Sequence, residues 1–291
     1  MSLLVTALLL EWWLGDPPNR WHPVAWFGRW ALWCETHLYQ NSSAAGLWAW
    51  LLAVVPALLI INTLYSLLGW SAGALLLWYS IGWRSLYTIV TSIFTAPSIN
   101  HARQLVAMVV SRDTATMQTD DIHRAALESL AENSSDAVIA PLFWFVVAGP
   151  VAAALYRMIN TLDATWGYRN SRYHNFGRVA AVIDDAANWF PARITALLLL
   201  LNGRWRAWSE IKQQAESHPS PNAGWPEAAL AFAAEIRLGG AVVRDGVRVE
   251  RPWYGTVMHP LTPQECQRAV QLVQQTLLMA AATALLITLV R

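Results

Sequence analysis

Charged residues are scarce in this chain, and cysteine is nearly absent. Of its 291 residues, 13% are Asp, Glu, Lys or Arg, whereas soluble domains have about 25%. Hydrophobic residues make up 55% of the chain, and the mean hydropathy is +0.31. This composition excludes an ordinary soluble domain and predicts an integral membrane protein, with the lipid bilayer as its partner.

Three further absences argue against whole classes of function. The net charge of +1 and the lack of a basic groove speak against a nucleic-acid partner. Cys34 and Cys266 lie far apart with no second thiol beside either, so neither a disulfide framework nor a zinc site follows. The sequence has no GxxxxGK[ST] loop, GxGxxG turn or GxSxG motif, which excludes the familiar soluble nucleotide-binding folds.

Long apolar runs predict the membrane helices. Residues 46–83 carry no charge and are about twice as long as one crossing requires, so they predict a helical hairpin that turns near residues 62–69. Residues 270–290 predict a final membrane helix, and residues 2–14 predict an apolar segment with Glu11 at its wet end. We expect this first segment to be retained, because it lacks a basic start and a small-residue cleavage site. Tryptophans, 18 in all, gather at the ends of such runs, as at a membrane–water interface.

Residues 15–28, GDPPNRWHPVAWFG, predict a rigid polar loop. Their three prolines are incompatible with a regular helix, and a glycine stands at each end. The loop carries Asp16 and His22 next to an apolar segment. It is therefore either a connector or a contributor to a site at the membrane surface.

Residues 84–131 alternate apolar and polar side chains at helical spacing. This pattern predicts amphipathic helices that lie along or just above the bilayer. Within them, residues 111–114 predict a loop, and Thr119 or Asp120 is expected to cap the helix that follows.

Residues 138–155 are apolar and nearly long enough to cross a membrane, but Pro141 and the pair Gly149-Pro150 interrupt them. The turn at 62–69 has no Lys or Arg and is expected outside, whereas the arginine-bearing residues 84–136 are expected inside. If residues 138–155 then crossed the membrane fully, the arginines that follow residue 155 would lie outside. That violates the positive-inside rule. We therefore expect a broken, re-entrant or protein-buried segment, with residues 100–135 and 160–180 on the cytoplasmic side.

The last third of the chain turns hydrophilic before its final helix. Residues 194–201 are too short to cross alone and are expected to extend the helix that carries Asp184 and Asp185. From Gly203 onward we expect a soluble excursion, with a helix at about residues 226–238 and a hairpin at Asp245-Gly246.

These features together predict an all-α, polytopic integral membrane protein. Residues 1–291 are expected to form a single membrane-embedded domain, in which residues 203–265 are a mostly soluble, cytoplasmic excursion. Amphipathic interfacial helices and one broken apolar segment complete the expected fold.

Polar side chains crowd into residues 128–193, where the surrounding sequence is apolar. They are Glu132, Asn133, Asp136, Arg157, Asn160, Asp163, Asp184, Asp185, Asn188 and Arg193. In helices, Glu132 and Asp136 would share a face, as would Asp184 and Asn188. Carboxylate and amide oxygens are ligands that Mg²⁺ prefers, and arginines suit phosphate or carboxylate groups. Any one of these residues could instead be a cap or an ion pair, but acids beside membrane-type sequence are costly, so the cluster predicts metal-assisted handling of phosphates.

The chain resembles the CobD/CbiB family in a series of ordered blocks. The blocks are GDPPNRWHPVAWFGRW, RSL at 84–86, SRDT at 111–114, ESLAENSSDAVIAPLFW, YRMINTLDATWGY, FGRVAAVIDDAANWFPARITA, SHPSPNAGWPEAA, and RLGG followed by ERPWYG. They cover nearly the whole chain. Two departures are mild: Ala137 stands where the family usually has Gly, and Glu11 stands where it often has Asp.

This resemblance implies a membrane enzyme of cobalamin biosynthesis, an adenosylcobinamide-phosphate synthase. Such an enzyme joins aminopropanol or its O-phosphate to a propionate carboxylate of adenosylcobyric acid through an amide bond, as a ligase that depends on ATP and Mg²⁺. The resemblance also implies a multi-pass protein of the bacterial inner membrane with a cytoplasmic active site. A homo-oligomer and an association with other late cobalamin-pathway membrane enzymes both stay open.

The resemblance and the residue chemistry together nominate site residues. Asp184, Asp185 and Asn188 are the preferred metal group, with Glu132 and Asp136 second. The expected catalytic residues are Glu132, Asp136, Asp163, and His22 or His218 as the base, and the expected binding residues are Asp16, Asn133, Arg157, Asn160, Arg193, Ser220 and Asn222. We expect residues 15–28, 132–136, 184–188 and 218–222 to line one wide cleft at the cytoplasmic membrane surface.

Two alternatives stay open. A Mg²⁺-dependent membrane prenyl- or alcohol-phosphate transferase would also use helix-borne acids, and the run from Asp184 to Asn188 superficially suits it, but a second aspartate-rich helix of similar spacing is missing. A non-enzymatic membrane sensor related to the family would keep the membrane frame. Its acid blocks would be expected to decay, and here they are complete.

Overall fold

The computed structural model describes residues 2–168, 170–201, 205–244 and 246–290. Three positions used in the sequence predictions, Arg169, Gly203 and Asp245, lie outside these ranges. The chain divides into two compact units. Unit 1 comprises Met1–Arg84, Asp136–Asn188 and Thr283–Arg291, and unit 2 comprises Ser85–Ser135 and Trp189–Ala282.

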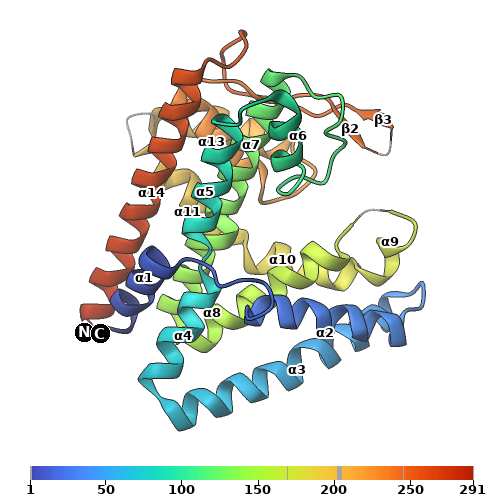
Figure 1. The fold of residues 1–291 in the computed structure, drawn as a ribbon, viewed down its shortest axis with the longest axis vertical. Helices are drawn as coiled ribbons and strands as arrows, with labels where there is room; N and C mark the ends of the chain where they lie inside the picture. Colours follow the sequence, from blue (N-terminus) through green and yellow to red (C-terminus); the bar gives the residue numbers. More distant parts are fainter. Residues whose placement is uncertain (1, 169, 202–204, 245, 291) are drawn as a thin grey trace. The chain divides into compact units, whose positions relative to one another are not determined.

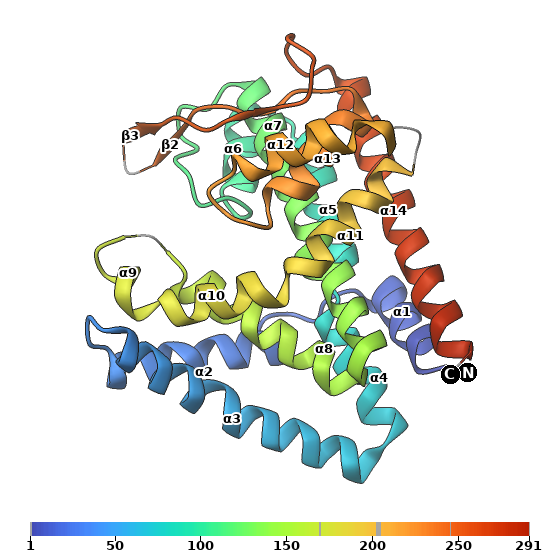
Figure 2. The ribbon, with the colours of Figure 1, turned by 180° about the vertical axis from the view of Figure 1, so that it is seen from behind.

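The regular elements in the described residues of unit 1 are all helices (Figure 1). Its helices are α1 (Leu3–Leu14), α2 (Pro23–Leu38), α3 (Ser43–Leu68), α4 (Trp70–Ser80), α8 (Ala140–Trp166), α9 (Tyr173–Phe176) and α10 (Arg178–Ala187). Helices α2, α3 and α10 pack against α8, and α1 packs against α4. In both views α2 lies beside the first part of α3, which then continues beyond it (Figures 1 and 2).

Unit 2 combines helices with two very short sheets. Its helices are α6 (Ile99–Val106), α7 (Thr119–Ser134), α11 (Trp189–Leu200), α12 (Trp208–Glu216) and α13 (Gly224–Ala234), with a 3₁₀ turn at Trp205–Ala207. Strand β1 (Leu238–Gly239) pairs antiparallel with β4 (Trp253–Tyr254), and β2 (Val242–Arg244) pairs with β3 (Val247–Val249). Two more helices contain a unit boundary: α5 (Trp83–Phe94) and α14 (Pro263–Val290).

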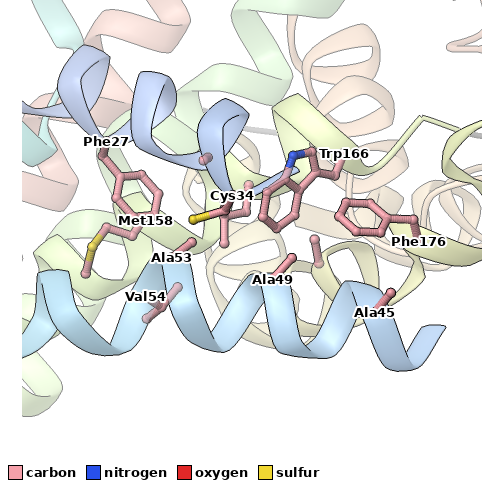
Figure 3. Packing of buried hydrophobic residues seen from close by; sticks show 12 residues of the cluster. Phe27, Cys34, Ala45, Ala49, Ala53, Val54, Met158, Trp166 and Phe176 are labelled. Atoms are coloured by element: carbon pink, nitrogen blue, oxygen red, sulfur yellow. The ribbon is translucent and has the colours of Figure 1, made fainter. Parts of the chain in front are cut away.

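Small residues let the helices of unit 1 approach closely. Ala45, Ala49 and Ala53 repeat every fourth residue on α3. In Figure 3 they lie next to Phe176, Trp166 and Cys34, respectively, which come from neighbouring helices. Gly46 lies on the same helix, where an added Cβ would come within 1.9 Å of the carbonyl oxygen of Phe176. Because no larger side chain fits there, this close packing depends on the small residues that the sequence supplies.

Helix α13 is the centre of unit 2. It packs against α7, α11, α12 and the paired strands β1 and β4. Its sequence, GWPEAALAFAA, is apolar on every side except at Glu227, as expected for a helix that is covered all round. A second core cluster joins α5, α6 and α7 through Ile93, Val106 and Ile122.

Three helices are long and apolar enough to cross a membrane, judged by length and composition within the described residues. They are Ser43–Leu68, the continuous helix Thr119–Trp166, and Pro263–Val290. The predicted turn between residues 62 and 69 is found at Gly69, whose φ of 55° lies in the region that favours glycine. These helices agree with the predicted membrane protein.

The predicted interruption at Gly149-Pro150 is confirmed, whereas Pro141 lies within the helix and does not interrupt it. Helix α8 loses helical geometry at Ala148 and Gly149, where the φ of Gly149 is 83°, directly before Pro150. Proline has no N–H for the helical ladder, and glycine adopts this backbone geometry without strain, so the two residues together break the helix.

Two predictions about the N-terminal quarter were wrong. Helix α2 begins at Pro23, inside the predicted loop, because proline at the first position of a helix loses no backbone hydrogen bond. Glu11 is not at a wet end: it is buried, and its Oε1 accepts a hydrogen bond from the backbone N–H of Arg84 at 2.9 Å. In return, the Arg84 guanidinium donates to the carbonyl oxygens of Trp12 and Trp13 at the end of α1.

The predicted extension of the helix that carries Asp184 was also wrong. Helix α10 ends at Ala187, and α11 starts after Asn188, whose φ of −93° and ψ of 0° are not helical. Pro191 explains the break, since its missing N–H cannot bond to the carbonyl of Ala187.

The boundaries of two other helices differ slightly from the predictions. Gln118, rather than Thr119 or Asp120, is the N-cap of α7, and its N–H donates to Asp121 at 3.0 Å. Helix α13 starts before and ends before the predicted range, at the left-handed Glu235. The predicted loop at residues 111–114 and the hairpin around Gly246 are present.

Candidate functional site

A π-helical segment separates two acids that the sequence placed on one face. Residues Ser135–Ile139 form this wider turn, between the end of α7 and the start of α8. A π-helical turn holds more residues than an α-helical turn, so the side chains that follow it are rotated relative to those before it. The two acids have different partners: Asp136 joins a polar group in unit 1, and Glu132 lies in the field of a charged group in unit 2.

The polar group of unit 1 consists of Asp136, Arg157, Asn160, Asp184 and Asn188. Asn160 donates through Nδ2 to Asp184 Oδ1 at 3.4 Å, and its Oδ1 accepts from Arg157 at 3.4 Å. Asn188 donates through Nδ2 to Asp136 Oδ1. Asp184 and Asn188 are 7% and 3% exposed, so these carboxylate and amide oxygens lie largely out of water. Five residues from the predicted cluster are therefore brought together.

Tyr156 lies at the same place and was missed by sequence reasoning. It is 1% exposed, and its hydroxyl has no hydrogen-bond partner among the described residues. The phenol is within electrostatic reach of Asp136, Asp184 and Arg157. The Arg157 Nε is likewise buried without a partner in the described chain. A tyrosine in an apolar helix gives no sequence signal, because it is usually a core residue.

The donors of this group fit a magnesium ion. Two carboxylates and two amides supply hard oxygen ligands, which Mg²⁺ prefers. No three His, Cys, Asp or Glu side chains in the described ranges are arranged to hold a metal by themselves. Mg²⁺ commonly takes one or two carboxylates from a protein and completes its shell with water and substrate phosphates.

Three other residues were predicted for the site, and two of them belong to unit 1. Asp185 is half-buried and, next in sequence to Asp184, projects from an adjacent face of α10. Asp163 is half-buried on α8, within electrostatic reach of Tyr156. Asn133 belongs to unit 2, where its amide donates to the Ser129 carbonyl one turn earlier in α7.

His22 has a structural position in unit 1. It is the N-cap of α2, where its Nδ1 accepts from the N–H of Val24 at 3.2 Å. The proton of the neutral ring is then on Nε2, which lies 3.5 Å from Asp16 Oδ1. This arrangement occupies the lone pair that a general base would need, so it favours a capping role.

The charged group of unit 2 consists of Arg112, Glu128, His218, Glu227 and Arg251. Glu128 accepts from Arg112, from Arg251 at 3.4 Å and from the N–H of Gly239 at 2.9 Å. Arg251 also donates to Glu227 at 3.3 Å and lies 2.9 Å from His218 Nε2. Glu128 and Glu227 are both 2% exposed. Five segments far apart in sequence therefore converge on two buried carboxyl groups.

The electrostatics of this group follow from burial. Burial raises the pKa of Glu227 well above its usual range, and Glu128 adds to this effect while Arg251 opposes it. Glu132 lies half-buried in the electrostatic field of Arg251, Arg112 and Glu128, and no described residue forms a hydrogen bond with its carboxylate. Glu132 is therefore the acid next to this group that is available to a ligand.

Arg193 is held tightly beside this group. Its guanidinium lies between the rings of Trp189 and Trp225, at 4.0 and 4.7 Å from their centroids. It donates to the Trp189 carbonyl at 2.7 Å and to Asn222 Oδ1 at 3.2 Å, and Ser220 Oγ accepts from the Asn222 N–H at 3.2 Å. The remaining N–H groups of Arg193 are those that a phosphate could use, and that role stays a prediction.

Sequence reasoning missed four members of the charged group. Arg112, Glu128, Glu227 and Arg251 all stand in the ordered blocks, but none was nominated for the site. The available signal was chemical: Glu227 is the one charged residue between Gly224 and Ala234, and burying a charge there requires partners. The predicted single cleft stays a prediction.

Comparison with protein families gives one match over most of the chain. Residues 4–273 match the family model described as CobD/Cbib protein.

Three of the similar proteins carry the same name. A cobalamin biosynthesis protein CobD from Chromobacterium violaceum is 40% identical over 300 residues, covering 97% of this chain and 95% of that protein. Its namesake from Stutzerimonas stutzeri is 44% identical, covering 87% and 86%, and that from Rhodobacter capsulatus is 37% identical, covering 95% and 93%. No solved structure matches this chain.

Proposed function

Because this chain belongs to the CobD/CbiB family, we propose that it acts in cobalamin biosynthesis as an adenosylcobinamide-phosphate synthase. The family match over residues 4–273, with relatives named cobalamin biosynthesis proteins that align over nearly their whole length, is the observation that carries the proposal. The reaction would join aminopropanol or its O-phosphate to a propionate carboxylate of adenosylcobyric acid. The product is an amide, and ATP drives its formation.

The chemistry sets demands on the residues that bind the substrates. A free carboxylate forms an amide only after activation, because oxide is too poor a leaving group. Transfer of a phosphoryl group from ATP gives an acyl phosphate, and attack by the amine then expels phosphate. The protein must therefore gather phosphates, a carboxylate and an amine while neutralising their charge.

The polar group of unit 1 suits the phosphates. Asp136 and Asp184, supported by Asn160 and Asn188, would hold Mg²⁺, which when bound neutralises phosphate charge and orients the phosphoryl group. Arg157 keeps a buried Nε without a partner among the described residues, so it can donate to a phosphate oxygen. The Tyr156 hydroxyl is a second unpaired donor beside the same acids.

The charged group of unit 2 suits the amine. An ammonium must lose a proton before it attacks, which requires a general base. Glu132 offers a carboxylate that can hold the ammonium, and His218 offers an imidazole that can take its proton. The broad, amide-rich corrin requires a wide and polar binding region, which a membrane-surface site can provide.

The location and partners follow the same proposal. We place the protein in the bacterial inner membrane with its active site on the cytoplasmic side, where ATP is available. Adenosylcobyric acid and the amino alcohol are its small-molecule substrates. A homo-oligomer, or an assembly with other late cobalamin-pathway membrane enzymes, is compatible with this location.

The test is a product assay on the full chain purified in detergent. Adenosylcobyric acid, ATP, Mg²⁺ and either aminopropanol or its O-phosphate are supplied, and the corrinoid is analysed by mass spectrometry with each component omitted in turn. The expected result is one new amide per corrinoid that requires every component. A parallel incubation supplies an isoprenoid diphosphate instead. An unchanged corrinoid in the first assay, together with release of pyrophosphate in the second, would support the transferase.

A further inference from the structure

Arg237 is a half-buried arginine that has no carboxylate partner among the described residues. It lies between the end of α13 at Ala234 and the start of β1 at Leu238. Its Nε is buried and makes no hydrogen bond within the described chain, and its Nη1 donates to the thioether sulfur of Met258 at 3.8 Å. A thioether is a weak acceptor, so the charge of this guanidinium has no anionic counterpart in the described ranges.

Other arginines of unit 2 show how the protein treats a largely buried guanidinium. Arg251 forms an ion pair with Glu128 at 3.4 Å, and Arg124 forms one with Asp121. A charge that is partly removed from water is costly unless it is paired. An anion bound to Arg237 would supply the partner that the described chain supplies to the other two arginines.

The ring of Trp253 in β4 holds the Arg237 guanidinium in place. The Arg237 Cζ lies 4.0 Å from the ring centroid, and the Cζ of Arg124 lies 4.9 Å from the same centroid. The ring is packed against Gly240, where an added Cβ would come within 2.4 Å of it. A guanidinium that stacks on an aromatic face keeps the N–H groups at its edge available for hydrogen bonds. The site is therefore preorganised for a ligand that approaches this edge.

This site is separate from the charged group of unit 2. Neighbouring residues of a strand point to opposite faces, and Tyr254 directly follows Trp253 in β4. The Tyr254 ring lies 6.3 Å from the imidazole of His218, which belongs to the charged group. Trp253 and Arg237 therefore lie on the other face of the β1–β4 pair.

One contact places this site beside the polar beginning of α14. Glu235, two residues before Arg237, accepts a hydrogen bond from Arg268 of α14 at 3.3 Å. All charged residues and glutamines of α14 precede Thr276, and the apolar stretch that could enter a membrane follows. A ligand of Arg237 is therefore expected to come from solution and not from the headgroup layer of the bilayer.

We propose that Arg237 binds the phosphate group of a soluble small molecule, while Trp253 orients the guanidinium. Nη1 and Nη2 donate to two phosphate oxygens, because the guanidinium fork matches two oxygens of one phosphate. Met258 is 80% exposed, so its side chain can leave Nη1 without loss of packing. A phosphate monoester carries about two negative charges at neutral pH and is therefore attracted more strongly than a carboxylate. This binding involves none of the residues assigned to amide formation, so it is independent of the proposed function.

The test reads the Trp253 ring by NMR and does not use activity. The full chain carries ¹⁵N-labelled tryptophan in detergent micelles, and Trp253→Phe identifies the Trp253 indole N–H signal among the 18 tryptophans. Inorganic phosphate, aminopropanol O-phosphate or ADP replaces chloride at constant ionic strength. The Trp253 signal should shift and saturate with at least one of these three probes. Propionate, a carboxylate, should need a higher concentration for half-saturation.

Four variants assign the response to Arg237. Arg237→Gln should raise the concentration of phosphate probe at half-saturation by about tenfold or more, because a charge-assisted pair is lost. Arg237→Lys keeps the charge but not the fork, and should weaken binding less. Arg248→Gln is the matched control, since it removes the same charge from an arginine that pairs with Glu250 at the surface, and should leave half-saturation unchanged. Met258→Leu removes the sulfur acceptor and should not weaken binding.

Three results would contradict this assignment. The first is a wild-type Trp253 signal that shows no saturable shift with any of the three phosphate probes, or the same half-saturation in wild type, Arg237→Gln and Arg237→Lys. The second is a response to propionate as strong as that to phosphate, which would make the site one for carboxylates. The third is a Trp253 signal that responds only when nanodiscs of phosphatidylcholine are replaced by phosphatidylglycerol, which would make a lipid the source of the phosphate.

Discussion

At the scale of single residues, Asp184 and Asp185 are neighbours with different surroundings. Asp184 is 7% exposed and bonded to Asn160, whereas Asp185 is half-buried on the next face of α10. Asn188 donates a hydrogen bond to Asp136, which supplies the second carboxylate near Tyr156. In the proposed function, Asp184 and Asp136 are therefore expected to contribute more to Mg²⁺ binding than Asp185.

Exchanging these acids for amides separates their roles. Asp184→Asn removes a charge with little change in shape, and should lower kcat/KM by about 100-fold or more while raising the Mg²⁺ concentration needed for half-maximal rate. Asp185→Asn is the matched variant and should have a smaller effect on both quantities. Wild-type turnover by Asp184→Asn at normal expression would return this acid to a structural role.

Glu227 predicts a pH dependence of stability. Its folded-state pKa is raised by burial, so the folded chain keeps a proton that the unfolded chain releases above its usual pKa. The stabilising contribution is complete below that usual pKa and is lost as the pH rises toward the folded-state value. Glu227→Gln resembles the protonated acid and cannot ionise, which removes this loss.

The measurement is the thermal unfolding midpoint in detergent between pH 5 and pH 8. Glu227→Gln should match the wild type at pH 5 and exceed it by about 2 °C or more at pH 8. Glu210→Gln, an exposed acid on α12, serves as the control and should follow the wild type throughout. A variant that loses stability most at pH 8 would show that the ionised carboxylate is stabilising.

At the scale of elements, the apolar segments and the glycine and proline residues that interrupt them could be predicted from the sequence. Residues 46–83 predicted two helices with a turn, and Gly149-Pro150 predicted the break in α8, because both depend on local backbone chemistry. The π-helix at Ser135–Ile139 had no such signal. The start of α2 at Pro23 and the break at Asn188 were misjudged, since proline can open a helix as well as end one.

The break in α8 predicts a difference between two glycines of unit 1. Gly149→Ala should destabilise the protein by about 1–3 kcal/mol, because alanine is strained at a φ of 83° although nothing lies within 4 Å of its Cβ. Gly28→Ala is the matched change inside α2, where the nearest atom, of Thr161, is 4.0 Å away. It should be neutral or stabilise by about 0.5–1 kcal/mol.

Unfolding midpoints of both variants in the same detergent test this account. A lower midpoint for Gly149→Ala with an unchanged or higher one for Gly28→Ala is the expected pair of results. Equal midpoints would mean that the break at Gly149 does not depend on glycine geometry.

At the scale of the whole molecule, composition was the strongest sequence signal. Low charge and long apolar runs predicted a membrane protein, and three helices within the described residues have the required length and hydropathy. Only part of the candidate site could be predicted from the sequence. Polar residues in apolar helices identified Asp184 and Asn188, whereas the charged group around Glu128 needed tertiary contacts between distant segments.

Membrane topology gives a prediction at this scale. Cys34 and Cys266 are buried, so single cysteines added at Ser66, Asn100 and Ser171 can be labelled over a low background. A membrane-impermeant maleimide applied to intact cells should label position 66, and should label positions 100 and 171 only after the membrane is opened. Labelling at position 171 in intact cells would contradict a cytoplasmic site.

The central claim is that the protein forms an amide by first activating a corrinoid carboxylate with ATP. Adenosylcobyric acid labelled with ¹⁸O in its free carboxylate tests this most directly. In the proposed reaction, one carboxylate oxygen bonds to the phosphoryl group, and amine attack leaves that oxygen on the phosphate released. We predict inorganic phosphate that carries one ¹⁸O for each amide formed, and loss of that label when Mg²⁺ is removed. Amide formation with unlabelled phosphate, or no amide with labelled substrate and ATP present, would contradict the account.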